Sequence, residues 1–185
     1  PGENAQRYFA KYNKQKRTFE ALTELIQETA DDIQYLESIS NALDIALSEA
    51  DLAQIKEELM QSGYIRRKHT KKKVKLTSKP MHYISSDGYD MYVGKNNLQN
   101  EELTFSFANG NDWWFHAKGA PGSHVIVKSG GDELPDRTFE EAGRLAAYYS
   151  KNRGADKVEI DYIQKKHVKK PNGAKPGFVV YYTNY

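Results

Sequence analysis

The sequence predicts an α+β protein: a long N-terminal coiled-coil helix with a short returning helix, followed by a compact α/β domain with a largely antiparallel sheet. Apolar residues recur at spacings of three and four over residues 3–47, the heptad pattern of a coiled coil. Polar and aromatic residues alternate over 112–116, the period of a β-strand. From residue 81 on, short segments of strand and helix pattern are separated by Gly and Pro. We expect a helical arm over 1–63, a basic linker over 64–80 and the α+β domain over 81–185.

The arm is expected to be one uninterrupted helix followed by a shorter one. No Pro or Gly interrupts its apolar seam, which consists of Tyr8, Tyr12, Phe19, Leu22, Ile26, Ile33, Leu36, Leu43 and Leu47. Ser48 with Asp51 three residues later is a capping-box pattern, so a second helix should begin there and end at Gly63. Because an uncovered apolar stripe is unfavourable in water, the seam requires a helix from further upstream or a second copy of the chain in a dimer.

Composition and charge restrict the class of partner. The 185 residues include no Cys, which excludes a disulfide scaffold and a thiol enzyme and suits a reducing compartment. No apolar run is long enough to cross a bilayer. Residues 1–62 hold 6 Lys and Arg against 12 Asp and Glu, a net charge of −6, whereas residues 63–185 hold 21 against 13, a net charge of +8. The second part is therefore the one expected to bind a polyanion.

Residues 64–79 form a basic run with few apolar anchors. Like charges at this density repel one another and resist packing, which favours a solvated linker. The same side chains could instead bind phosphates, because basic segments of this kind often become ordered on nucleic acid. Both interpretations stay open.

The domain is predicted to contain six strands and two helices, in the order strand, strand, helix, strand, strand, helix, strand, strand. Asp87-Gly88 between the first two strands is the strongest hairpin signal in the chain. The expected elements cover residues 82–85, 89–93, 97–107, 112–116, 123–127, 138–152, 158–163 and 178–182.

The two helices are predicted from caps and apolar spacing. Asn97 is the expected cap of the first, and Thr138 with Glu141 forms a capping box for the second. Their inward faces should carry Leu98, Leu103 and Phe107 in the first helix, and Phe139, Ala142, Ala146 and Tyr149 in the second.

Chemically versatile side chains gather in residues 111–129. Ser123, a histidine and Asp112 supply the residue types of a hydrolytic triad, but Ser123 does not lie at a nucleophile elbow, and neighbouring strand residues point to opposite faces. His116 and His124 could face each other, but a metal site would need two further ligands from distant positions. The segment PNGAKPG does not match a phosphate-binding P-loop. We therefore expect no catalytic residues, no metal and no cofactor.

Nucleic-acid binding accounts for these residues better than a reaction does. The segment QKKHVKKPNGAKPG supplies cations for phosphates, namely Lys165, Lys166, Lys169, Lys170 and Lys175. Rings suited to stacking on unpaired bases are His167, Trp113 and Tyr182. At least half of the aromatic residues, including Trp114, Phe115 and Tyr181, are expected to fill the core instead.

Motifs in the same order along the whole chain resemble the NFACT family. They are NAQRYFAKYNK, GKNNLQNEELT, D-x-W-x-H followed by P-G-S-H-V, and DYIQKKHVKKPNGAKPGFVVY. The resemblance implies a C-terminal fragment made of the coiled-coil arm and the RNA-binding (NFACT-R) domain, and the missing initiator Met also favours a fragment. Carried over position by position, it implies RNA-binding roles for Asn96, Asn97, Asn100, Asp112, Trp114, His116, Pro121, Gly122, Ser123 and His124, then Lys169, Lys170, Pro171, Asn172, Gly173, Lys175, Pro176 and Gly177. Trp113 departs from the family pattern.

The resemblance further implies a cytoplasmic ribosome-quality-control factor. Such proteins bind obstructed large ribosomal subunits, with their rRNA, and recruit tRNA for C-terminal alanine tailing. The family's large N-terminal domain is missing here, so this fragment is expected to bind without completing tailing. Some streptococcal and staphylococcal relatives are described as surface adhesins that bind fibronectin or fibrinogen, which gives the alternative function and a cell-surface location. A steep loss of affinity with salt for RNA, unmatched for fibronectin, would favour the first.

Overall fold

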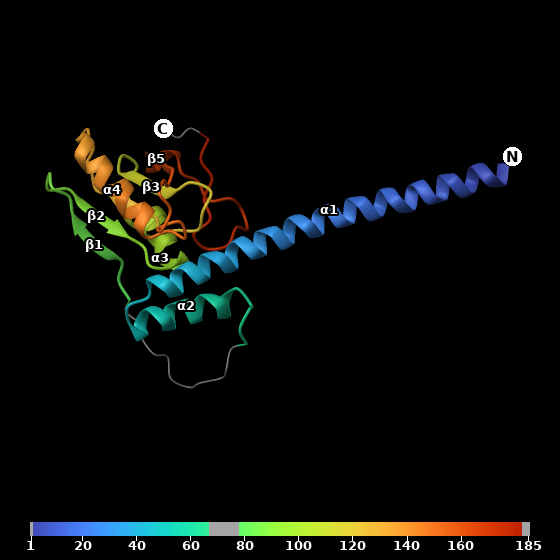
Figure 1. The fold of residues 1–185 in the computed structure, drawn as a ribbon, viewed down its shortest axis with the longest axis horizontal. Helices are drawn as coiled ribbons and strands as arrows, with labels where there is room; N and C mark the ends of the chain where they lie inside the picture. Colours follow the sequence, from blue (N-terminus) through green and yellow to red (C-terminus); the bar gives the residue numbers. More distant parts are fainter. Residues whose placement is uncertain (1, 67–77, 183–185) are drawn as a thin grey trace. The chain divides into compact units, whose positions relative to one another are not determined.

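The computed structural model describes residues 2–66 and 78–182 and confirms the α+β fold class. Packing divides the chain into two compact units, residues 1–36 and residues 37–185. Residues 67–77, which make up most of the predicted basic linker, lie outside the described residues. Figure 1 shows the elements in sequence order.

A single helix, α1 (Gly2–Ile45), accounts for the predicted heptad pattern. Within the first unit its seam side chains are exposed, and Tyr8, Phe19 and Ile26 each keep more than half of their accessible surface. The coiled-coil partner of this seam stays a prediction.

The second helix, α2 (Glu49–Gln61), begins at the predicted capping box. The Ser48 side chain accepts a hydrogen bond from the Asp51 N–H at 3.3 Å, and the Asp51 carboxylate accepts one from the Ser48 N–H at 3.0 Å. The helix ends just before Gly63, whose φ of 82° lies in the left-handed region. Sequence pattern and local hydrogen bonding agree here.

Five strands form one antiparallel sheet in the order β1-β2-β4-β3-β5. The strands are β1 (Met81–Ile84), β2 (Asp90–Val93), β3 (Trp113–Ala117), β4 (Val125–Val127) and β5 (Ile160–Gln164). The predicted turn at Asp87-Gly88 joins β1 to β2, and Gly88 takes a φ of 89°. The largely antiparallel sheet is therefore confirmed.

Each face of the sheet carries its own apolar cluster. The helix α4 (Asp136–Tyr148) covers the face that presents Val93, Phe115 and Val125 (Figure 1). The other face presents Trp114, Ile126 and Ile163, which pack with Leu103 and Val168. The short helix η1 (Leu103–Phe107, a π-helix) supplies Leu103 to this second cluster and directly follows α3 (Asn97–Glu102). Val168 comes directly after η2 (Lys165–His167, a 3-10 helix).

Two of the predicted caps were wrong. Asn96, not Asn97, caps α3 by accepting a hydrogen bond from the Gln99 N–H at 2.9 Å. The helix α4 begins at Asp136, so Thr138 lies inside it, fully buried, and its hydroxyl bonds Asp87 at 2.7 Å. Glu141 binds Ser86 in the β1–β2 turn. The Thr and Glu of this pattern tie the helix to a distant turn, which competes with local capping.

The last predicted strand, residues 178–182, does not form. One isolated bridge pairs Lys169 with Val180, and the segment packs Val179 and Tyr181 onto the second apolar cluster. The Tyr181 hydroxyl donates to Asp161 at 2.6 Å, which holds the chain across the sheet face instead of along an edge. The predicted helix over 97–107 changes to a π-helix at Leu103, and Phe107 is 40% exposed, contrary to the predicted inward position.

Candidate nucleic-acid interface

The predicted site residues separate into buried and exposed groups. Those buried are Asn96, Asn97, Asn100, Asp112, Trp114, Ser123 and His124, while His116, Lys165 and Lys175 are partly buried. Those exposed are Lys166, His167, Lys169, Lys170 and Asn172. Most side chains of the first group are held in hydrogen-bond or ring contacts inside the fold. The second group lies on residues 164–177, here called the C-terminal loop.

Trp114 is the centre of the buried group. It is fully buried on β3, with its ring centroid 5.6 Å from His116, 5.1 Å from His124 and 5.1 Å from Tyr181. The indole N–H has no hydrogen-bond partner among the described residues. The ring therefore contributes apolar contact and aromatic packing rather than a hydrogen bond.

The two histidines of this cluster are held in their neutral form. Burial lowers the pKa of His116 to about 4, although Asp161 and a backbone hydrogen bond to Gly122 act in the opposite direction. Burial, together with His116, lowers the pKa of His124 well below its usual value. The ring of His124 also bonds the Thr104 hydroxyl at 2.8 Å. Neutral, hydrogen-bonded rings of this kind are parts of the core.

Asp112 fixes the turn that leads into β3. Its buried carboxylate accepts hydrogen bonds from the Asn109 N–H at 2.7 Å and the Ser129 N–H at 3.2 Å, and it pairs with Lys128. A carboxylate with three donors is satisfied where it lies.

The asparagines connect elements that are distant in sequence. Asn97 Nδ2 donates to Ser38 at 2.7 Å and to Glu58 at 2.8 Å, which ties α3 to α2 and the end of α1. Asn100 accepts from the His124 N–H at 3.0 Å and donates to the Gly122 carbonyl at 3.2 Å. Gly177 has a φ of 79°, and a Cβ there would lie 3.0 Å from Asn97.

Asp51, on α2, is the centre of a second polar cluster between α2 and the domain. Burial raises the pKa of this carboxyl, but Lys95, Ser78 and the cap hydrogen bonds lower it by more, so its pKa lies well below the usual range. Gln54 joins the contact by accepting from Asn96 at 2.9 Å and Gln99 at 2.8 Å. The asparagine-rich motif thus holds α2 to the domain.

Replacing Asn97 by alanine should therefore lower the free energy of unfolding by about 2 kcal/mol, because Glu58 and Ser38 lose a buried donor. Urea denaturation of the chain measures this change. The control is Asn172→Ala at an exposed position of the C-terminal loop, which should be close to neutral. Unchanged stability in Asn97→Ala would contradict the structural role.

The C-terminal loop is attached to the domain by some of its own lysines. Lys170 pairs with Glu101 at 2.6 Å, and the same carboxylate accepts from the Gly177 N–H at 3.2 Å. Lys175 donates to the Tyr64 hydroxyl at 2.8 Å. Lys166 and Lys169 are exposed and form no ion pair with any described residue. These two are the cations best placed to bind an incoming phosphate.

A partly exposed set of three rings was not predicted from the sequence. His82 on β1 stacks on Tyr92 on β2, with centroids 4.7 Å apart, and Tyr92 meets Phe107 edge to face at 4.7 Å. The signal was present, since the alternation in MHYI and DMYV places both rings on one sheet face. Phe107 is the last residue of the π-helix and is exposed, whereas apolar spacing predicted an inward position.

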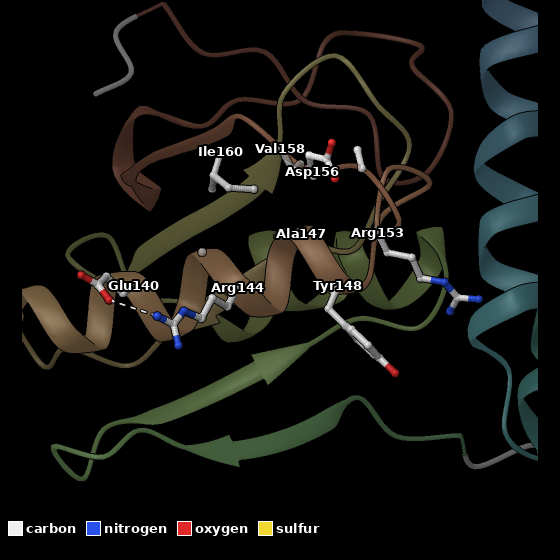
Figure 2. A pocket seen from close by; sticks show the side chains of 10 residues that line it. Glu140, Arg144, Ala147, Tyr148, Arg153, Asp156, Val158 and Ile160 are labelled. Carbon is white, nitrogen blue, oxygen red and sulfur yellow. Dashed lines mark hydrogen bonds and ion pairs between the residues drawn. The ribbon is translucent and has the colours of Figure 1, made fainter.

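A shallow hollow of about 540 Å³ lies on the α4 side of the sheet, and Figure 2 shows side chains that line it. The lining includes Gly143, Ala147 and Ile160. Arg144 pairs with Glu140 at 3.5 Å, and Arg153 and Asp156 also line the hollow. Balanced charges make this hollow a poorer site for a polyanion than the C-terminal loop.

Among the described residues, 2–66 and 78–182, no group of three or more His, Cys, Asp or Glu side chains is arranged to hold a metal ion. No helix in this part of the chain is long and apolar enough to span a membrane.

Comparison with known proteins gives the same family along the chain. The family model of NFACT N-terminal and middle domains matches residues 1–78, and that of the NFACT protein RNA binding domain matches residues 79–182. Proteins named Rqc2 homolog RqcH are 48% identical over 182 residues in Streptococcus pneumoniae (strain D39) and 43% identical over 186 residues in Bacillus subtilis. Each match covers 98% of this chain and 32% of the relative, so the chain spans about a third of their length.

A solved structure is similar over almost the whole chain. It is the C-terminal part of the fibronectin/fibrinogen-binding protein from Streptococcus suis, with a TM-score of 0.89 and 46% identity. The match covers 98% of this chain and 72% of that one.

Proposed function

Because the chain belongs to the NFACT family, we propose that it is the RNA-binding and ribosome-binding part of a ribosome-quality-control factor. The main observation behind this proposal is the set of exposed lysines on the C-terminal loop. Lys166, His167 and Lys169 face solvent on a segment that Lys170 attaches to Glu101 on α3 and Lys175 attaches to Tyr64, just after α2. Lysines on an attached segment suit a phosphate backbone, because less order has to be gained on binding.

Family membership supports a finer role as part of this proposal. We place the chain on obstructed large ribosomal subunits and on tRNA during C-terminal alanine tailing, acting in the cytoplasm by binding rather than by catalysis. The arrangement of Ser123 supports the binding role, since its buried hydroxyl bonds neither histidine. In this proposal the buried signature residues shape the surface, and the loop lysines contact RNA.

The test is binding of the chain to tRNA and to large ribosomal subunits across a salt series. Changing Lys166 and Lys169 to Glu should lower RNA affinity about tenfold or more and flatten the slope of log K against log salt by about 1.5. Arg153→Glu with Lys157→Glu is the matched control, because it changes the net charge equally at exposed positions around the α4 hollow.

Equal losses in the two double variants would show that overall charge, and not this loop, sets the affinity. Fibronectin and fibrinogen belong in the same assay, because the similar solved structure is of a protein named for binding them. Binding of fibronectin at physiological salt without binding of tRNA or subunits would overturn the proposed function. The opposite result would support it.

A further inference from the structure

The register of the sheet determines which side chains share the face opposite α4. Directly paired residues in neighbouring strands point to the same side, and the pairs His82 with Tyr92, Tyr92 with Ile126, Ile126 with Trp114, and Trp114 with Ile163 run across all five strands. Trp114, Ile126 and Ile163 are covered by the second apolar cluster, whereas His82 is exposed at the β1 edge. The row of paired side chains therefore continues beyond the covered core, to Tyr92 and His82.

At the uncovered end of this row, His82 and Tyr92 form an ordered set of three rings together with Phe107 on η1. His82 and Tyr92 are nearly parallel, with an interplanar angle of 18°, and Phe107 closes the set edge-on at 68°. His82 is held in place by Asp90 at 2.7 Å. About 46% of the His82 side chain and 40% of Phe107 face solvent, so ring surface is available on β1 and at the end of η1.

Neither His82 nor Phe107 belongs to the two apolar clusters of the domain. Solvent-exposed ring surface at such positions is well suited to stacking on other rings. Core packing alone therefore does not account for their arrangement.

Residues 110–112, together with Lys128, link the three rings to the C-terminal loop. Lys128 lies 4.8 Å from the centre of the Phe107 ring and pairs with Asp112. The Asp112 carbonyl accepts from the Lys165 N–H at 2.8 Å, and the Gly110 carbonyl accepts from the Lys166 N–H at 2.9 Å. The lysines of the C-terminal loop and the three rings thus lie on parts of the fold that are joined through the same turn. Sites for single-stranded nucleic acid combine cations and stacking rings in this way.

We propose that His82, Tyr92 and Phe107, here called the ring platform, stack on unpaired nucleobases of RNA whose phosphates bind the lysines of the C-terminal loop. The inference rests on the proposed RNA-binding function and adds a preference to it. Bases in a duplex already stack on one another, whereas those of a single-stranded loop or end are free to stack on protein rings. The platform therefore favours single-stranded RNA over duplex RNA.

The test compares an unstructured 12-nucleotide RNA with a duplex of the same length, at pH 8 and fixed salt. Changing His82 and Phe107 together to Ala should weaken binding of the single strand about tenfold or more, with duplex binding and the salt slope nearly unchanged. Tyr92 stays in place, because it packs against the core. Tyr148→Ala removes a ring on α4 that is 59% exposed, more than either platform ring that is changed; it is the control and should bind both RNAs as wild type does.

A ring-keeping variant, His82→Phe with Phe107→Tyr, separates stacking from folding and should retain the preference for the single strand. If the alanine variant loses affinity for both RNAs to the same extent, or loses affinity for neither, the platform is wrong but the proposed function still stands. Absence of RNA binding by the wild-type chain would overturn both.

Discussion

Replacing Trp114 by alanine is expected to lower the free energy of unfolding by about 3 to 5 kcal/mol. The indole is fully buried and contacts His116, His124 and Tyr181, so truncation leaves a cavity beneath the C-terminal segment. The loss should appear in urea denaturation as a lower midpoint with little change in slope. RNA affinity should then fall only under conditions where the variant unfolds.

Trp114→Phe provides the control for this change. Because the indole N–H has no partner among the described residues, phenylalanine retains most of the apolar contact without breaking a hydrogen bond. Its loss of stability should be less than half of that seen with alanine. An alanine variant that is as stable as wild type but binds RNA poorly would instead identify Trp114 as a direct RNA contact.

Local signals predicted the parts of the fold that local interactions determine. The Ser48 and Asp51 capping box, the turn at Gly88 and the alternation in β3 each involve neighbouring residues, and the structure has all three. The buried polar face of α3 could not be predicted in this way. Asn97 is satisfied by Ser38, 59 residues earlier, so apolar spacing favoured Leu98 and Phe107 as the inward residues.

The candidate site shows the same division. The cationic character of residues 165–175 is evident from sequence, but the pairing of Lys170 with Glu101 and of Lys175 with Tyr64 depends on tertiary contacts. Those contacts leave Lys166 and Lys169 as exposed cations without an ion pair to any described residue. Likewise, alternation places His82 and Tyr92 on one face, but the path of the C-terminal segment decides which part of that face is covered.

The His116 and His124 pair should make the fold sensitive to mild acid. Both folded-state pKa values lie below the ordinary value, so the neutral rings are the form that folds. Stability is therefore full above about pH 6.5 and is lost as pH falls toward and through 4. For His116, the difference between 6.5 and about 4 corresponds to a loss of about 3 kcal/mol once the ring is protonated.

Urea denaturation between pH 7.5 and 4 measures this loss, and the window excludes the Asp51 pair. The pKa of that carboxyl is lowered, so its contribution is present above about 3.8 and disappears only at lower pH. His116→Gln should flatten the pH dependence, whereas His167→Gln, at an exposed position, should retain it. A wild-type stability that stays constant from pH 7.5 to 4 would show that the buried histidines are able to accept protons without cost, since Asp161 and the Gly122 carbonyl would then fully compensate their desolvation.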